Sequence, residues 1–230
     1  MDSHEVRFIE RIGCGADIAA FRFTKPKGYT FAAGQYLTLT LSTAEGDQTK
    51  PFTHSQAPAD PYLEITTRLS GSAFKNALEA LAPGDTVHVA GPAGHLVLPA
   101  EERSLVFLVG GVGITPCRSM LRDLIGRGER VEAVVLFGNR DESCVPYRDE
   151  LEAMAPYGVC VVHVLEDPPE DWHGERGFIS SGTVRRHVAD DTRWLYLTSG
   201  PPVMVEAMER VLDEVQVPLS RRMVERFGQR

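Results

Sequence analysis

The chain has 230 residues, of which 43% are hydrophobic, 24% charged and 8% aromatic, as in a globular protein with a buried core. Its 24 Lys and Arg against 32 Asp and Glu leave a net charge of −8, which argues against a general nucleic-acid binder, because neutralising phosphates takes a surplus of positive charge. No stretch reaches the ~18–20 apolar residues of a membrane span, and residues 1–5 lack the character of a secretion signal. We therefore expect a cytoplasmic protein of one large or two compact domains.

The cysteine and histidine spacing gives no reason to expect a metal. Cys14, Cys117, Cys144 and Cys160 are too far apart for the paired spacing of zinc or iron–sulfur sites, and no two of the seven histidines stand four residues apart on a helix. We expect no metal site, no cluster and no structural disulfide, so that the cysteines act as small apolar residues.

From residue 6 to about residue 98, short runs of alternating apolar residues are separated by Gly and Pro. The clearest runs are 36–41, 62–67 and 86–89. Period-two runs rich in β-branched and aromatic residues are typical of antiparallel strands. About six such strands and one helix over 72–81 predict an N-terminal antiparallel β-barrel, since closure removes exposed edges.

After residue 98, apolar strands alternate with amphipathic helices. The strands are expected at 105–109, 131–137, 159–165 and 195–198, and the helices at 116–127, 147–155 and 202–215. This alternation predicts a doubly wound parallel sheet, of five strands, covered on both faces. We place the boundary near Pro99, with domains 1–99 and 100–230.

Two strand-to-helix turns of the second domain carry glycines. The first runs from 110 to 116 and the second from 198 to 202. Glycines let a ligand approach the backbone, and a helix N-terminus favours an anion such as a pyrophosphate. Either turn alone could be purely structural, but two at one carboxyl edge support each other. The residues concerned are Gly110, Gly111, Gly113, Thr115, Pro116, Ser199, Gly200 and Pro201.

The first domain offers a candidate cradle at Lys50-Pro51-Phe52-Thr53, which joins a cation, an aromatic ring and a hydroxyl. A charge for phosphate and a flat ring for stacking suit a flavin. The alternative is a solvated lysine beside a core phenylalanine. Gly71-Ser72, before the barrel helix, could be a helix cap alone or a second phosphate seat.

Together these segments resemble the ferredoxin–NADP reductase superfamily over nearly the whole chain. Seven motifs of that family occur here in the family's order. They are G-Q-Y, R-x-Y-S/T, a phosphate-binding turn, P-G-D…G-P-x-G, G-G-x-G-I-T-P, C-G-P-P-x-M and E-x-F/Y. They match residues 34–36, 50–53, 71–72, 83–94, 110–116, 199–204 and 225–227. In three places the sequence departs: Lys50 replaces arginine, Phe52 replaces tyrosine and Ser199 replaces cysteine. A lysine offers phosphate a point charge where arginine offers a fork.

The resemblance implies an FAD-dependent NAD(P)H oxidoreductase with NADH or NADPH as co-substrate. It also implies a separate redox partner, such as ferredoxin, flavodoxin or an oxygenase component. Thr53, Ser199 and Glu225 would surround the hydride-transfer position, and Phe227 would cover the flavin. The flavin would be held by Lys50, Pro51, Phe52, Thr53, Gly71 and Ser72, and the dinucleotide by Gly110, Gly111, Gly113, Thr115, Pro116, Asn139, Arg140, Gly200 and Pro201.

Two points concern specificity. Asn139, Arg140 and Asp141 follow a strand where such folds meet the adenosine ribose, and the acidic neighbourhood favours NADH. Lys25, Lys27, Arg68 and Lys75 are candidates for a basic landing patch for an acidic carrier. Two alternative functions stay open: an enzyme that reduces free flavin as a substrate, and a flavin- or nucleotide-binding regulatory module without turnover.

Overall fold

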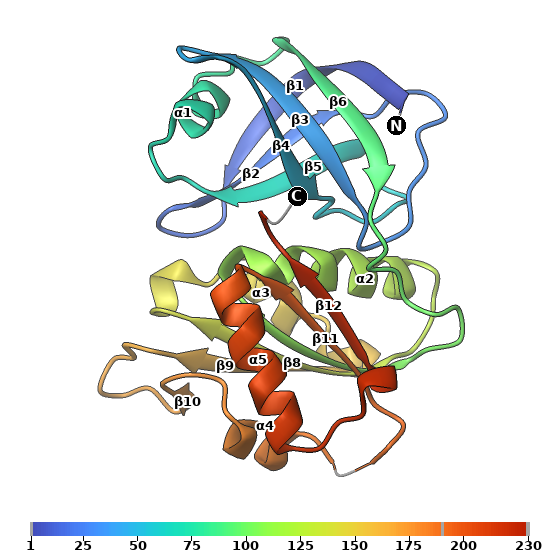
Figure 1. The fold of residues 1–230 in the computed structure, drawn as a ribbon, viewed down its shortest axis with the longest axis vertical. Helices are drawn as coiled ribbons and strands as arrows, with labels where there is room; N and C mark the ends of the chain where they lie inside the picture. Colours follow the sequence, from blue (N-terminus) through green and yellow to red (C-terminus); the bar gives the residue numbers. More distant parts are fainter. Residues whose placement is uncertain (1, 190, 229–230) are drawn as a thin grey trace.

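The structure is a computed structural model that describes residues 2–189 and 191–228. It holds two six-stranded sheets, one above the other in Figure 1, joined by the segment 94–103. The first domain contains β1 Asp2–Gly13, β2 Ile18–Thr24, β3 Tyr36–Thr43, β4 Gly46–Thr53, β5 Tyr62–Arg68, α1 Ala73–Glu79 and β6 Thr86–Ala93. The second contains β7 Ser104–Gly110, α2 Ile114–Gly126, β8 Glu132–Asn139, α3 Arg148–Glu152, β9 Val159–Leu165, β10 Glu175–Arg176, α4 Ser181–His187, β11 Leu195–Gly200, α5 Pro202–Glu214 and β12 Arg222–Arg226.

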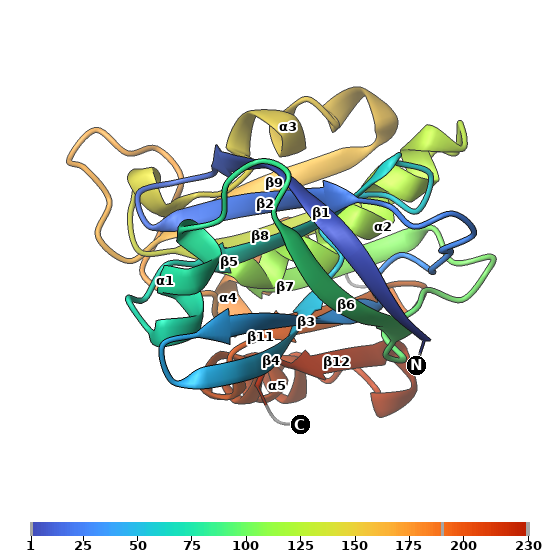
Figure 2. The same ribbon diagram turned by 90° about the horizontal axis from the view of Figure 1, so that it is seen from above.

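The first sheet is antiparallel and curls on itself in the order β4-β3-β6-β1-β2-β5 (Figure 2). Alternation along β3 turns Leu37, Leu39 and Leu41 into the core, as a strand with one buried face requires. The edge strands β4 and β5 are joined by one isolated bridge, between His54 and Ile65. The antiparallel barrel domain is thus confirmed. Its sheet closes at that bridge, and the cleft described below opens between β4 and β5.

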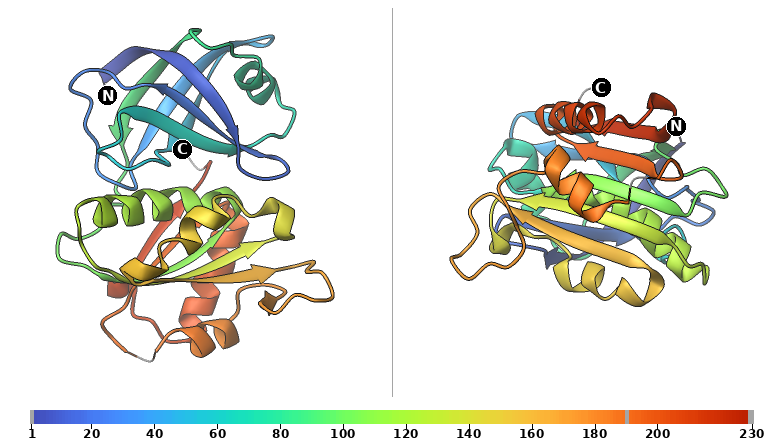
Figure 3. Two further views of the ribbon diagram at one scale, coloured as in Figure 1. Left: turned by 180° about the vertical axis from the view of Figure 1, so that it is seen from behind. Right: turned by 90° about the horizontal axis from the view of Figure 1, so that it is seen from below.

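The second sheet is parallel, in the order β10-β9-β8-β7-β11-β12. Leu105, Phe107 and Val109 of β7 pack into the core that α2 and α3 cover, while Val106 and Leu108 pack into the core that α4 and α5 cover. Figure 3 shows these helix pairs on opposite faces of the sheet. The doubly wound class is therefore confirmed.

Three details differ from the sequence prediction. The sheet has six strands where five were expected, and the two for which no range was predicted are β12 and β10, a two-residue strand that carries no apolar pattern. The helix expected at 147–155 is limited to Arg148–Glu152, and a 3₁₀ turn that contains Pro156 follows it. Helix α4 was not anticipated, although Ser180 and Thr183 form a capping box at its start.

Helix α2 lies between the sheet and the barrel domain, and the C-terminal end of the described chain lies beside the domain boundary (Figure 1). Parallel sheets bind ligands at the carboxyl ends of their strands. The ends of β7, β8 and β11 are therefore where a site is expected.

Candidate functional site

A cleft opens where the two domains meet, and residues of both domains line it. The barrel domain contributes Tyr36, Pro51, Phe52, Thr53, Thr66 and Thr67, and the second domain contributes Val112, Thr115, Glu225, Arg226, Phe227 and Gly228. The cleft thus lies between β4 and β5 on one side and a glycine turn and the C-terminal strand on the other.

The barrel side of the cleft is built by the end of β4. Phe52 is half-buried and stacks on Phe74 of α1, with ring centres 5.8 Å apart. Because side chains alternate along a strand, exposed Lys50 shares the face of Phe52. Thr53 is 9% exposed and lies opposite Tyr36 of β3. The end of β4 therefore brings a ring and a hydroxyl to the cleft, while Lys50 lies two residues before Phe52 and is not a lining residue.

His54 fixes the position of the residue that follows this motif. Its Nδ1 lies 2.8 Å from the Gln35 carbonyl oxygen and its Nε2 lies 3.1 Å from the Tyr29 hydroxyl. Burial lowers the pKa of His54 to about 4, so that the ring is neutral at ordinary pH. A neutral ring that donates from Nδ1 accepts at Nε2 from Tyr29, and this side chain belongs to the barrel core.

Gly71 and Ser72 lie at the start of α1. Gly71 has φ +71°, and the Ser72 hydroxyl accepts a hydrogen bond from the Lys75 amide at 3.4 Å. The structure thus shows an N-cap at this turn. Neither residue lines the cleft.

The two turns of the second domain are tied to each other. The Ser199 hydroxyl, 3% exposed, donates to the Gly113 carbonyl oxygen at 2.7 Å. A Cβ on Gly113 would lie 2.2 Å from the Ser199 carbonyl oxygen, so only glycine fits there. Thr115, which lines the cleft, donates its hydroxyl to the Val112 carbonyl oxygen at 3.0 Å. Ser199 therefore supports the glycine turn from behind.

The C-terminal strand completes the cleft. β12 runs parallel to β11 with Glu225 opposite Ser199, and the Phe227 amide donates to the Gly200 carbonyl oxygen at 2.8 Å. This pairing carries Glu225 and Phe227 to the cleft, where both are lining residues. Gly200, with φ +150°, and Pro201 precede α5 at the same edge.

The expected ribose-binding segment lies at the end of β8. Asn139 is 5% exposed, and within the described part of the chain neither of its side-chain amide atoms has a hydrogen-bond partner. Arg140 is exposed and donates to the Asp141 carboxylate at 2.9 Å. An orphaned buried amide at this edge is a group that a ligand could satisfy.

Sequence reasoning missed two acidic residues beside this segment. The Glu166 amide donates to the Asn139 carbonyl oxygen at 3.0 Å, and the Asp167 amide donates to that of Arg140 at 2.8 Å. Both residues are exposed and follow β9, the neighbouring parallel strand. The end of β9 was predicted correctly from the sequence. An acidic residue directly after a parallel strand is typical of a ribose-binding position, and this signal could have identified Glu166.

The cleft brings together six of the predicted site residues. These are Pro51, Phe52, Thr53, Thr115, Glu225 and Phe227. The others lie around it at the helix starts and strand ends described above. They are Lys50, Gly71, Ser72, Gly110, Gly111, Gly113, Pro116, Asn139, Arg140, Ser199, Gly200 and Pro201.

Three of the four basic residues of the expected landing patch have other contacts, and Lys27 is exposed. Lys25 donates to the carbonyl oxygens of Pro58 and Asp60, at 2.5 and 3.1 Å. Arg68 pairs with Asp17 at 3.2 Å and approaches the turn at Gly111. Lys75 contacts residues of the cleft wall. The structure therefore does not support a patch made of these residues with Lys27.

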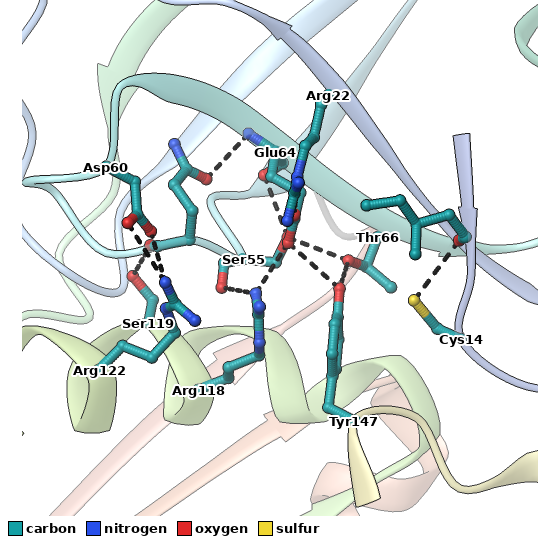
Figure 4. A network of polar contacts seen from close by, with 12 residues as sticks. Cys14, Arg22, Ser55, Asp60, Glu64, Thr66, Arg118, Ser119, Arg122 and Tyr147 are labelled. Atoms are coloured by element: carbon teal, nitrogen blue, oxygen red, sulfur yellow. Dashed lines mark hydrogen bonds and ion pairs between the residues drawn. The ribbon is translucent and has the colours of Figure 1, made fainter. Parts of the chain in front are cut away.

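A polar network joins the domains behind the cleft (Figure 4). The Arg118 guanidinium of α2 binds the Glu64 carboxylate of β5 at 2.7 Å and lies 4.0 Å from the centre of the Tyr147 ring. Burial alone would raise the pKa of Glu64, but Arg118 and Arg22 outweigh it and hold that pKa below its usual value. The carboxylate is therefore charged and paired.

The same network reaches the wall of the cleft. The Tyr147 and Thr66 hydroxyls are hydrogen-bonded, and Thr66 is a lining residue. Tyr147 has φ +58°, a left-handed conformation that is rare for an aromatic residue and persists where surrounding contacts hold it. The relative position of the domains at the cleft is thus fixed by specific contacts.

Comparisons with known proteins agree with this geometry. Residues 5–98 match the family model of the oxidoreductase FAD-binding domain, and residues 107–210 match that of the oxidoreductase NAD-binding domain. Ferredoxin–NADP reductase B of Sorangium cellulosum is 31% identical over 224 residues, covering 90% of each chain. NADH-cytochrome b5 reductase 1 of Aspergillus terreus is 29% identical over 228 residues, covering 90% of this chain and 75% of the relative.

A solved structure shows the same fold. It is a ferredoxin–NADP⁺ reductase from Neisseria gonorrhoeae with bound FAD and NADP, with a TM-score of 0.86, 18% identity, and coverage of 98% of this chain and 99% of the other. The two domains and the cleft between them thus define an FAD-dependent NAD(P)H oxidoreductase. The chain belongs to the ferredoxin–NADP reductase family, and the expected family, cofactors and enzyme class are confirmed.

Across residues 2–189 and 191–228, no group of three or more His, Cys, Asp or Glu side chains is arranged to hold a metal ion. None of the helices in this part of the chain combines the length and apolar character that crossing a bilayer requires.

Proposed function

We propose that this chain oxidises NADH and delivers the electrons to a separate carrier protein, such as a ferredoxin, a flavodoxin or an oxygenase component. The observation that carries the proposal is the cleft, which places Thr53 of the barrel domain opposite Thr115 and Glu225 of the second domain. A cofactor held by one domain can there meet a co-substrate held by the other. The similarity to a protein named ferredoxin–NADP reductase supports a carrier as acceptor.

The residues of the cleft suit the cofactor in charge and shape. FAD, when bound, supplies the redox chemistry, taking up a hydride and releasing electrons. Phe52 offers a ring for contact with the flavin, and Phe227 lies where it would cover a flavin face until the nicotinamide enters. Thr53 offers a hydroxyl at the flavin edge, and Lys50 a charge for its phosphates.

The second domain holds and orients the nicotinamide dinucleotide. The turn Gly110–Gly113 and the start of α2 present backbone amides to its pyrophosphate, and Ser199 keeps that turn in place. Glu225 lies at the cleft on β12, where its carboxylate can orient the nicotinamide.

The preference for NADH rests on Glu166. Asp141, which sequence reasoning favoured, is bound by the Ser143 amide and by Arg140, so its carboxylate is already occupied. Within the described part of the chain the Glu166 carboxylate forms no hydrogen bond or ion pair, and the Glu166 amide donates to the Asn139 carbonyl oxygen. A carboxylate at this edge suits a ribose 2′-hydroxyl and repels a 2′-phosphate.

Anaerobic titration of the purified protein with NADH and with NADPH tests the function, followed by assay with candidate carriers. We expect NADH to bleach the bound FAD and the reduced protein to reduce a carrier. In the assay, the catalytic efficiency with NADH should be at least about tenfold above that with NADPH. Absence of bleaching with either nucleotide would favour the regulatory module. Release of FAD on reduction, with turnover of added free flavin, would favour the free-flavin reductase.

A further inference from the structure

Lys75 reaches from helix α1 to the wall of the FAD cleft. Its ammonium nitrogen lies 4.6 Å from the centre of the Phe52 ring and 5.7 Å from that of Phe74. It also donates a hydrogen bond to the Thr67 hydroxyl. Phe52 and Thr67 both line the cleft, so this cation is directed towards it although the residue belongs to a helix on the outside of the barrel.

Within the described residues, the positive charge of Lys75 is not balanced by an acidic side chain. Among the residues that the structure describes, Lys75 forms no ion pair, and the charged group that acts on it is Lys50, which is also positive. Burial, and then Lys50, lower the pKa of Lys75 to about 8. A half-buried cation beside a second cation lowers the stability of the folded chain. Residues that lower stability in this way are typical of binding sites, where the ligand supplies the missing partner.

We propose that Lys75 is a phosphate-binding residue for FAD and acts together with Lys50. Lys50 stands where the family motif has arginine, and it lies on the same face of β4 as Phe52, the ring that Lys75 contacts. An arginine binds phosphate through bidentate hydrogen bonds, whereas a lysine offers a single point charge. Two lysines from two elements can therefore supply the interaction that one arginine would have given.

This inference rests on the binding of FAD that family membership gives, and not on the proposed carrier or on the preference for NADH. A packing role for Lys75, through the two rings and Thr67, predicts the opposite behaviour on substitution. If the ammonium only packs, removing it lowers the stability of the flavin-free chain and affects all flavins alike. If it binds phosphate, removing it relieves repulsion and affects only flavins that carry phosphate.

The test is Lys75→Met in the full chain after removal of flavin, with FAD and riboflavin each titrated by fluorescence quenching. We expect FAD to bind about tenfold to a hundredfold more weakly, because a charge-assisted contact is lost, while riboflavin, which has no phosphate, binds as in the parent. The melting temperature of the flavin-free variant should equal or exceed that of the parent. Lys75→Arg should restore the affinity for FAD.

Lys27→Met is the matched control, because Lys27 is exposed on the same domain, and it should change neither affinity. If Lys75→Met yields too little folded protein, Lys75→Gln is measured in the same way. Equal weakening of FAD and riboflavin, or unchanged FAD affinity with a lower melting temperature, would overturn the assignment. Because binding is the readout, a chain that binds FAD as expected but reduces no carrier would leave this inference standing and remove the proposed function.

Discussion

The Arg118 guanidinium, on α2 of the second domain, lies 2.7 Å from the Glu64 carboxylate, on β5 of the first, and the two side chains are 3% and 1% exposed. Arg118 also donates to the Ser55 carbonyl oxygen at 2.5 Å and to Glu150 at 2.9 Å. A buried ion pair adds little when intact, but removing one partner leaves an uncompensated charge. This pair therefore makes the two domains dependent on each other.

Arg118→Met should destabilise the protein by about 3–5 kcal/mol, because Glu64 would stay buried with Arg22 as its remaining partner. Urea unfolding of the flavin-loaded chain measures the change. Arg130→Met, at an exposed position, is the control and should stay within about 0.5 kcal/mol of the parent. A loss below about 1 kcal/mol for Arg118→Met would contradict this expectation, because it would show that Glu64 does not depend on Arg118 for compensation of its buried charge.

Ser199→Ala should raise the KM for the nicotinamide and cost about 1–3 kcal/mol of stability, because the Gly113 carbonyl loses its buried hydrogen bond. The affinity for FAD should not change, since Ser199 lies outside the cleft wall. Steady-state kinetics and a flavin titration separate the two effects. Ser42→Ala, which removes an exposed hydrogen bond to Asp47, is the comparison. Reduction kinetics identical to the parent would remove Ser199 from the site.

Glu225→Gln should slow reduction of the bound flavin by NADH about tenfold or more while leaving flavin content unchanged, because the carboxylate is at the transfer side of the cleft. Stopped-flow absorbance under anaerobic conditions measures the rate. The neighbouring Glu209→Gln on α5, which affects an ion pair with Arg226, controls for loss of charge near the strand. Equal rates for parent and Glu225→Gln would mean that this carboxylate plays no part in transfer.

The stability of the flavin-free chain should rise with pH between about 8 and 10.5, the folded and ordinary pKa values of Lys75. In this window the unfolded chain binds a proton that the folded chain has lost, so alkalinity favours the folded state, whereas below pH 8 both forms are protonated and the full cost of burial remains. Denaturation of parent and Lys75→Met across the window isolates this residue: the gap between them should narrow as pH rises. A constant gap would contradict the lowered pKa.

Glu166→Ser should shift the ratio of catalytic efficiencies towards NADPH by about tenfold, because the carboxylate no longer opposes a 2′-phosphate. Steady-state assays with both nucleotides give the ratio. Glu170→Ser, on the exposed loop that follows, should leave it unchanged. An unaltered ratio for Glu166→Ser would mean that this carboxylate does not set the preference, and would point to exposed Arg140 at the same edge, because an arginine suits a 2′-phosphate.

The sequence predicted the two-domain order and most strand positions, because hydrophobic period reports local burial. Phe52, Thr53, Thr115 and Glu225 could be found since each belongs to a short contiguous motif. The Arg118–Glu64 pair could not, because its members are separated by 54 positions and neither stands in a motif. Pairing of distant charges depends on how two domains meet, which no local pattern contains.

The position of the Lys75 side chain could not be predicted from the sequence for a different reason. As a lysine in the first turn of a short amphipathic helix it was expected at the surface, where most lysines lie. The helix begins beside the open side of the barrel, and a four-carbon side chain can cross that distance to Thr67. Its position follows from the gap between β4 and β5, which only the three-dimensional structure reveals.

The path of β12 has a practical consequence for anyone who joins another segment to the chain near it. Gly228 borders the cleft, so a tag or a fused protein attached close to this residue would begin near the opening of the cleft. An affinity tag placed there would compete with the nucleotide for space. An electron carrier tethered at the same point would instead begin its search next to the reduced cofactor, at high effective concentration.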